Sequence, residues 1–264
     1  MSNSLPTSGQ LPLWLEQARF HLPAVPDALA RLLLLIVVAL FLNTFVLQPY
    51  IIPSESMEHT LLVGDFVLVN RQAYAPSSAL SRSFLPSRSV ARGDIVVFHH
   101  PQHPYIVKRV IGLPGDRLRI ADGRVTVNGA PLTEPYAAFE PAPRNPCRDE
   151  FPVTICTDPN VEPAWWMQMQ SLVHDGELLV PPGEYFVLGD NRNYSKDSRF
   201  WGFVSRQQII ARPLVIYFSL SRPSSTDAQP AELQAADDKL GHGREFATRF
   251  QDFARWKRIF RVVH

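Results

Sequence analysis

An uncharged apolar run close to the N-terminus is the feature that most limits how this chain can fold. Residues 32–47 read LLLLIVVALFLNTFVL and carry no charged side chain. Together with residues 28–31, the mostly apolar stretch reaches about 20 residues, which is what one helix needs to cross a bilayer core. Arg31 can extend towards the headgroups at one end, and Pro49 cannot continue a helix at the other. We therefore expect a transmembrane helix over residues 28–48.

Two other interpretations of this run stay open, a cleaved signal peptide and a buried helix of a soluble core. A signal peptide is disfavoured because about 30 residues precede the run and no small-x-small cleavage motif follows it. Asn43 is compatible with a spanning helix, which tolerates a single Asn. Arg19 and Arg31 precede the run, and Arg71 is the first Arg or Lys after it. This asymmetry favours a cytoplasmic N-terminus and an external main body.

The composition permits a globular body and argues against several classes of partner. The chain has 264 residues, 45% of them hydrophobic and 19% charged, so it can bury a sizeable core. A formal net charge of +1 and the lack of a basic stripe give no reason to expect nucleic acid. His99, His100 and His103 fit a solvated loop better than a zinc site. We expect neither a metal nor another cofactor.

Beyond the apolar run the sequence predicts a mainly β fold made of antiparallel sheets. Segments rich in β-branched and aromatic residues predict strands at 66–69, 95–98, 106–111, 185–188 and 214–218. Residues 117–120 and 124–127 alternate polar with apolar side chains across Asp122-Gly123, which is typical of a hairpin. Helical patterns do not alternate with these segments, so we do not expect a parallel α/β sheet.

Changes in composition divide the chain into five parts. These are a cytoplasmic lead-in at 1–27, the transmembrane helix at 28–48, a catalytic β domain from 49–129 and 183–220, a Pro-rich inserted subdomain at 130–182 and a C-terminal extension at 221–264. The extension carries aromatic residues at helical spacing, Phe246, Phe250, Phe253 and Trp256. This pattern fits an amphipathic helix at an anionic lipid surface or a plain surface helix.

The two cysteines lie in the Pro-rich part of the chain. Cys147 and Cys156 are the only cysteines of the sequence. An oxidising compartment would allow them to close a small disulfide loop, in agreement with an external location. The alternative is a pair of unrelated thiols.

Two short segments each carry a side chain that could react. Ser56 lies in the segment IPSESM, which follows the apolar run closely, and Lys108 lies in the strand-like segment YIVKRVI. An amine among apolar side chains loses hydration, and this loss lowers its pKa. A neutral amine near pH 7 could take a proton from a serine hydroxyl. That is the Ser-Lys form of nucleophilic catalysis.

The order of these segments resembles that of the bacterial type I signal peptidases, the membrane-bound leader peptidases. The resemblance runs through most of residues 32–218 and includes the apolar run. The other matching segments are PSESM with LLVGD at 53–65, RGDIVVF at 92–98, KRVIGLPGD at 108–116 and GDNR through SKDSR at 189–199.

The resemblance implies a role for each residue of the two reactive segments. Ser56 would be the nucleophile and Lys108 the general base. The Ser54 hydroxyl and the Ser56 backbone N–H would donate to the oxyanion, and such donors contribute on the order of 10²–10³ in rate.

The resemblance also implies a group of supporting residues. Ser195 would hydrogen-bond to the lysine amine and orient it. Asp197 and Arg199 would brace that loop through an ion pair, and Arg109 would join the bracing. The alternative is that Asp197 and Arg199 form an ordinary surface pair, which contributes little to stability.

Members of this family remove signal peptides from secreted preproteins by acyl transfer at the outer face of the cytoplasmic (inner) membrane. They cut after small residues at the first and third positions before the scissile bond. The implied partners are therefore preprotein signal peptides and the lipid bilayer, with no nucleic acid. The residues that would line the small substrate pockets, or would be ordinary core, are Ile52, Pro53, Met57, Ile106 and Val107.

Two positions depart from the family pattern. Glu55 stands where a glycine commonly separates the two serines, and His59 stands where a proline commonly precedes the threonine. A carboxylate beside Lys108 would raise the pKa of its amine, so we expect Glu55 to point to solvent. We do not expect His59 to take part in catalysis, because three residues after a nucleophile is not a reliable geometry.

Three other kinds of protein share some of these features. A soluble self-cleaving Ser-Lys repressor would need a DNA-binding segment, which this chain lacks. A catalytically silent membrane protein would be expected to lack Ser56 or Lys108. A specialised peptidase for pilus or conjugation subunits is the closest alternative, because these motifs do not specify the substrate set.

Overall fold

The computed structural model describes residues 27–41, 43, 46–74, 88–101, 103–153, 155–221 and 254–264. The chain forms two compact units, residues 1–42 and residues 43–264. In the first unit the described element is helix α2 (Asp27–Phe41), whose side chains are not buried. The expected lead-in, apart from Asp27, lies outside the described residues.

The helix expected over residues 28–48 is shorter in the structure and stops before its predicted end. Among the residues that are described, none of the helices combines the length and apolar character required to cross a bilayer. Leu47 and Gln48 belong instead to strand β1 (Leu47–Ile51), where they pair with Asn70 and Val69. Because β1 forms an edge of its sheet, it can accommodate Pro49, which has no N–H to donate.

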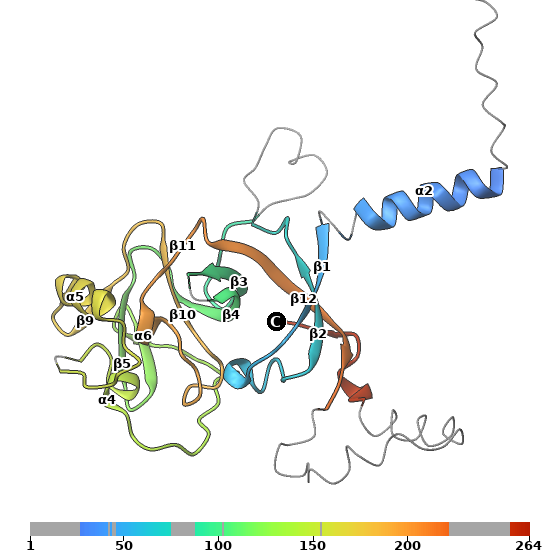
Figure 1. The fold of residues 1–264 in the computed structure, drawn as a ribbon. Coiled ribbons are helices and arrows are strands. Elements are labelled where there is room, and N and C mark those ends of the chain that lie inside the picture. The colour runs from blue at the N-terminus through green and yellow to red at the C-terminus, as the bar shows by residue number, and fades with distance from the viewer. Residues whose placement is uncertain are drawn as a thin grey trace, which may run out of the picture. The chain divides into compact units, whose positions relative to one another are not determined.

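The larger sheet has the strand order β1-β2-β12-β3-β4-β10-β11, with β13 paired to β12, and every registered pair is antiparallel (Figure 1). After β1, its strands are β2 (Asp65–Asn70), β3 (Ile95–His100), β4 (His103–Gly112), β10 (Glu184–Leu188), β11 (Val204–Ser205), β12 (Ile209–Ser219) and β13 (Arg261–Val262). The five strands predicted from β-branched and aromatic content are confirmed in β2, β3, β4, β10 and β12.

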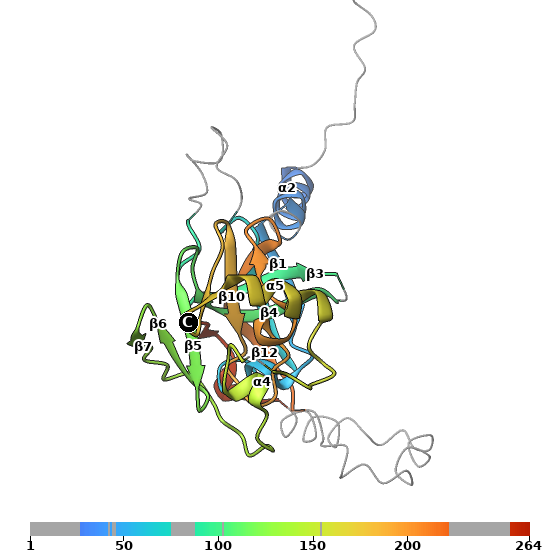
Figure 2. The same cartoon turned by 90° about the vertical axis from the view of Figure 1, so that its left-hand side faces the viewer.

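The smaller sheet is antiparallel as well, with the order β7-β6-β5-β9-β8. Figure 2 shows its strands β5, β6 and β7. Its strands are β5 (Arg117–Ala121), β6 (Arg124–Val127), β7 (Ala130–Pro131), β8 (Val173–His174) and β9 (Glu177–Leu179). The predicted hairpin is confirmed as β5–β6, with Asp122 and Gly123 both at positive φ in its turn. The Pro-rich segment at 130–182 therefore shares its sheet with this hairpin.

Short helical elements connect the strands. They are η2 (Glu55–Met57), α4 (Pro146–Asp149), α5 (Pro163–Leu172), α6 (Ser198–Trp201) and η3 (Trp256–Arg258). In the described part of the C-terminal extension, η3 is a single 3-10 turn and β13 pairs with Val215 and Ile216. The prediction of a helix that continues through residues 254–264 is therefore wrong, because the backbone of this segment pairs with the larger sheet. Phe246, Phe250 and Phe253 lie outside the described residues.

An apolar cluster lies beneath the loop between β1 and β2 and holds it to the larger sheet. Its buried members include Ile52, Met57 and Leu61 of that loop, packed with side chains from β2, β3, β4 and β12. Backbone hydrogen bonds close the base of the loop, from Ile52 N to Asp65 O and from Gly64 N to Ile52 O. Packing and hydrogen bonding thus fix the segment that carries Ser56.

The two cysteines form a disulfide, with Cα atoms 5.5 Å apart and a sequence separation of nine. The first of them, Cys147, lies in α4, whose N-terminus is capped by Asn145. Of the alternatives open from the sequence, the structure contains the closed loop and not two separate thiols.

Replacing both cysteines by serine should lower the free energy of unfolding by about 2–3 kcal/mol, because a loop of this size gains conformational entropy in the unfolded chain. Urea unfolding followed by circular dichroism would measure the change. A reducing agent should destabilise the parent by a similar amount and leave the double variant unaffected. Equal stability of the parent and the double variant would contradict the prediction.

Candidate active site

Ser56 lies in the single turn of η2, on the loop that leaves edge strand β1. This turn is closed by a hydrogen bond from Glu58 N to Glu55 O, and the turn that follows it by one from Leu61 N to Met57 O. Ser56 is largely buried, and its carbonyl oxygen accepts from the Asn191 N–H. The peptide on the C-terminal side of the serine is thereby oriented by a second segment of the chain.

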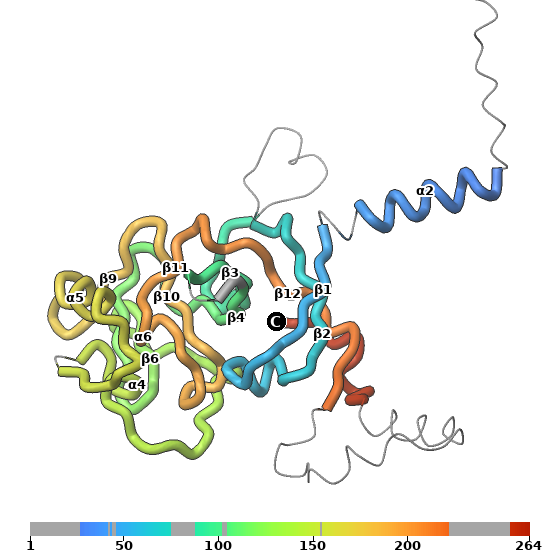
Figure 3. Tube along the Cα trace, in the orientation of Figure 1, coloured from blue at the N-terminus to red at the C-terminus, as the bar shows by residue number. Residues whose placement is uncertain are grey.

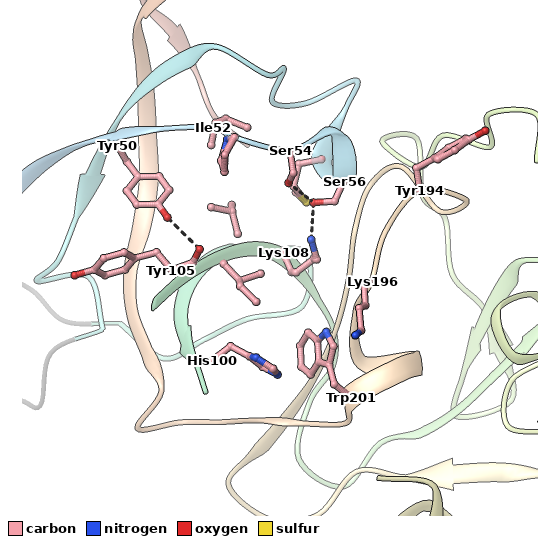
Figure 4. Close-up of a pocket in the computed structure, with 14 residues that line it drawn as sticks. Tyr50, Ile52, Ser54, Ser56, His100, Tyr105, Lys108, Tyr194, Lys196 and Trp201 are labelled. Atoms are coloured by element: carbon pink, nitrogen blue, oxygen red, sulfur yellow. Dashed lines mark hydrogen bonds between the residues drawn. The ribbon is translucent and has the colours of Figure 1, made fainter. Parts of the chain in front are cut away.

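Lys108 lies on β4, a strand with neighbours on both sides, and only 3% of its surface is exposed. Its Nζ donates to Ser56 Oγ over 2.5 Å (Figure 4). Burial lowers the pKa of Lys108 to about 8, although the carboxylates of Asp197 and Asp190 oppose the shift. A buried amine that loses its proton near neutral pH, in contact with a hydroxyl, is the arrangement expected of a general base.

Ser54 lies two residues before the buried serine, in extended backbone. Its Oγ is 3.3 Å from Ser56 Oγ (Figure 4). A hydroxyl at this position can reach an oxygen of a group bonded to Ser56. The geometry is therefore compatible with the donor role that the family resemblance implies for Ser54.

The pair Asp197 and Arg199 is buried, and the surface-pair alternative is wrong. Asp197 has no exposed surface and caps the N-terminus of α6. It accepts two hydrogen bonds of 2.8 Å from the Arg199 guanidinium and one of 3.0 Å from Gly189 N. Burial opposes ionisation of this carboxyl, but these donors outweigh it and hold the pKa of Asp197 below its ordinary value.

Ser195 is buried in the same loop, yet the expected hydrogen bond to Lys108 is not formed. Within the described structure its Oγ has no hydrogen-bond partner. It lies close enough to Asp197 to help lower the pKa of that carboxyl, without reaching hydrogen-bond geometry. The side chain packs against Gly189, where an added Cβ would lie 2.2 Å from the Ser195 Oγ. The close approach leaves no space for a side chain at position 189.

Arg109 braces the site from the residue after the lysine, as expected. Its guanidinium donates to both carboxylate oxygens of Asp190, over 2.8 and 2.7 Å, and lies 3.9 Å from the centre of the Tyr136 ring. Asp190 also accepts from Thr60 Oγ1 over 2.5 Å. This buried network connects β4, the loop after Ser56 and the segment that begins at Gly189.

A cavity of about 590 Å³ opens beside Ser56 and Lys108 (Figure 4). All five residues expected at the substrate pockets line it, namely Ile52, Pro53, Met57, Ile106 and Val107. Sequence reasoning missed the other part of the wall, formed by Tyr50, His100, Tyr105, Tyr194, Lys196 and Trp201. Tyr194 and Lys196 flank Ser195, so the motif that contains Ser195 could have indicated these two residues. The approach of His100 to Trp201, with ring centres 5.0 Å apart, depends on the fold.

The two residues that depart from the family pattern both face away from the buried pair. Glu55 is exposed, as expected. His59 is exposed too, and its Nε2 lies 3.6 Å from the Glu140 carboxylate. Its φ of +78° is in the left-handed region, which a proline cannot adopt. The turn after Ser56 therefore has a backbone conformation that a proline at position 59 could not support.

Known proteins match this chain over most of its length. The family described as signal peptidase, peptidase S26, matches residues 26–218, which is most of the chain. The chain belongs to this family. Membership makes it a peptidase, a hydrolase that cleaves peptide bonds, and supports the predicted relationship to the type I signal peptidases.

Individual relatives cover most of the chain and of their own length. A signal peptidase I of Leptolyngbya laminosa is 37% identical over 205 residues, covering 74% of this chain and 81% of the relative. A signal peptidase I of Aquifex aeolicus is 34% identical over 241 residues, with coverages of 78% and 90%. One from Pseudomonas fluorescens is 32% identical over 200 residues, with 70% of each chain covered.

The turn geometry at His59 gives a test of the site. Replacing His59 by Pro should lower the free energy of unfolding by about 1–3 kcal/mol, because the ring excludes the observed φ. Cleavage activity should fall as well, since the turn carries Ser56. His59→Gly is the matched control and should keep both properties. Thermal melts would measure stability and rate assays would measure activity. A proline variant as stable and as active as the parent would show that residue 59 does not have the positive φ described here.

Proposed function

We propose that this protein is a membrane-bound serine endopeptidase that removes signal peptides from secreted preproteins, with Ser56 as nucleophile and Lys108 as general base. The supporting observation is the 2.5 Å contact between the buried Lys108 amine and the Ser56 hydroxyl, at the edge of an open cavity. Family membership supports the reaction class, because signal peptidases of this family act on peptide bonds.

The proposed reaction is acyl transfer in two stages. Ser56 Oγ attacks the scissile carbonyl carbon while Lys108 Nζ takes the hydroxyl proton. The Ser54 hydroxyl and the Ser56 N–H donate to the oxygen that becomes negative. The ammonium then protonates the leaving amine, and the mature protein departs with the signal peptide left as an ester on Ser56. Water, deprotonated by the same amine, hydrolyses this ester and restores the enzyme.

The cavity wall supports a preference for small side chains next to the scissile bond. Ile52 and Met57 are almost fully buried, and both belong to the apolar cluster beneath the loop. Such residues cannot withdraw to admit a large side chain without disturbing the core. Together with Val107 they give an apolar, close-packed surface beside Ser56, which suits alanine-sized groups.

Membrane attachment and location are further parts of the proposal. The apolar run at 32–47 and helix α2 support an anchor that tethers the domain to the bilayer. Tethering raises the effective concentration of Ser56 near cleavage sites that emerge at the lipid surface. The disulfide supports an oxidising compartment, and so the outer face of the bacterial cytoplasmic membrane. The partners are signal peptides and lipid, with no nucleic acid.

Ser56→Ala and Lys108→Met should each abolish cleavage of preproteins, because one variant lacks the nucleophile and the other lacks the base. The assay is incubation of the full chain in detergent with several unrelated preproteins, with product N-termini mapped by mass spectrometry. Both variants should remain folded, since methionine fills the space of the lysine stem without a charge. Preprotein processing by either variant at a rate near that of the parent would refute the assignment.

The same assay distinguishes the proposed function from the alternative of a specialised peptidase. Cuts after small residues in unrelated preproteins support a general signal peptidase. Cleavage confined to pilus-type or conjugation-type subunits would support the alternative.

The cleavage rate should increase with pH until the lysine has lost its proton. Below its pKa the Lys108 amine carries a charge and cannot accept the serine proton, so kcat/KM should rise about tenfold per pH unit and level off above pH about 8. Initial rates between pH 6 and 10 would establish the profile. A rate that does not change with pH across this range would rule out a titrating base.

A further inference from the structure

A segment from the end of the chain lies against the loop that carries Ser56. We call residues 52–65 the nucleophile loop and residues 254–264 the C-terminal segment. Figure 3 shows this segment beside β2 and β12, and β13 pairs with β12. Val263 is buried in the same apolar cluster as Ile52, Met57 and Leu61. The segment is therefore part of the packing beneath the nucleophile.

Arg258 of this segment makes the most direct contacts with the nucleophile loop. Its Nη2 donates to the Thr60 carbonyl oxygen over 2.9 Å and to Asp65 Oδ2 over 2.5 Å, and its Nε donates to Asp65 Oδ1 over 3.1 Å. Asp65 is fully buried, and it also accepts from Leu62 N within the loop. One planar guanidinium thus joins the turn after Ser56 to the base of the loop, which a lysine cannot do with the same geometry.

Thr60 is held on its other side by the bracing network of the active site. Its hydroxyl donates to Asp190, and its N–H donates to Met57 O. The following residue, Asn191, fixes the Ser56 carbonyl. The turn between Ser56 and Thr60 is therefore clamped between the Asp190 side and the Arg258 side.

The turn needs this support because its own sequence does not favour its shape. His59, immediately before Thr60, has a φ of +78°, which is unfavourable for a residue with a Cβ. Neither a glycine nor a proline predefines the backbone there. Contacts from outside the loop must then select the conformation that places Ser56 Oγ against Lys108.

We propose that Arg258 is a positioning residue for the nucleophile. It keeps the turn after Ser56 in the conformation that holds the serine hydroxyl at the lysine amine. This inference rests on the proposed function of Ser56 and Lys108. Arg258 is not among the residues that line the cavity beside Ser56, so its loss should affect the chemical step far more than substrate binding.

The test compares Arg258→Lys with the double variant Arg258→Gln/Asp65→Asn, in the full chain and the preprotein assay. The double variant removes the charges of both partners of this contact, so that a buried carboxylate is not left with only Arg255, 4.0 Å away, as its cationic partner. Lys257→Gln is the matched control, because it removes the same charge from an exposed neighbouring side chain. Rates are normalised to the folded fraction from thermal melts.

The expected result is at least a tenfold fall in kcat for both Arg258 variants, with KM changed by less than about twofold. The pH at which kcat reaches half its plateau should move upwards, because an amine separated from Ser56 becomes more hydrated. Lys257→Gln should behave as the parent does.

A folded variant with unchanged kcat and an unchanged pH profile would overturn the proposal, as would a loss explained entirely by the unfolded fraction. These outcomes differ from failure of the proposed function, which would appear as preprotein cleavage that persists in Ser56→Ala. An unaffected Arg258 variant combined with Ser56-dependent cleavage would reject only the positioning role.

Discussion

The proposed active site depends on keeping one buried amine uncharged. Burial disfavours the ammonium form of Lys108, and the contact with Ser56 gives the neutral amine a proton to accept. Asp197 and Asp190 lie near enough to oppose this, because each carboxylate favours a charged lysine. Both are held by buried arginine side chains. The Arg199 charge lowers the pKa of Lys108 and so opposes the effect of the two carboxylates.

The second requirement is close packing between segments that are far apart in the sequence. At Gly189 an added Cβ would lie 2.4 Å from the Ser56 carbonyl oxygen and 2.2 Å from Ser195 Oγ. Its φ is outside the left-handed region, so glycine is needed here for space and not for backbone freedom. The nucleophile loop, β4 and the segment from Gly189 therefore fit together only because one of them has no side chain.

Much of this could be predicted from the sequence, because the signals were local. Alternating residues across Asp122-Gly123 define a hairpin through turn geometry, and Lys108 among β-branched neighbours indicates a buried amine. The end of α2 was mispredicted because apolar content does not distinguish a helix from the strand that follows it. The missing hydrogen bond at Ser195 Oγ in the described structure could not be predicted either, since the packing of this residue against Gly189 depends on the fold.

By itself, the sequence determined the family of this protein and which two side chains to propose for its chemistry, since Ser56 and Lys108 lie in segments whose order is typical of one family. Tertiary structure alone decided how that pair is held. The aromatic wall formed by His100 and Trp201, and the contact of Arg258 with Thr60, join residues far apart in the chain. Such contacts arise from strand pairing and core packing, which no local pattern of residues encodes.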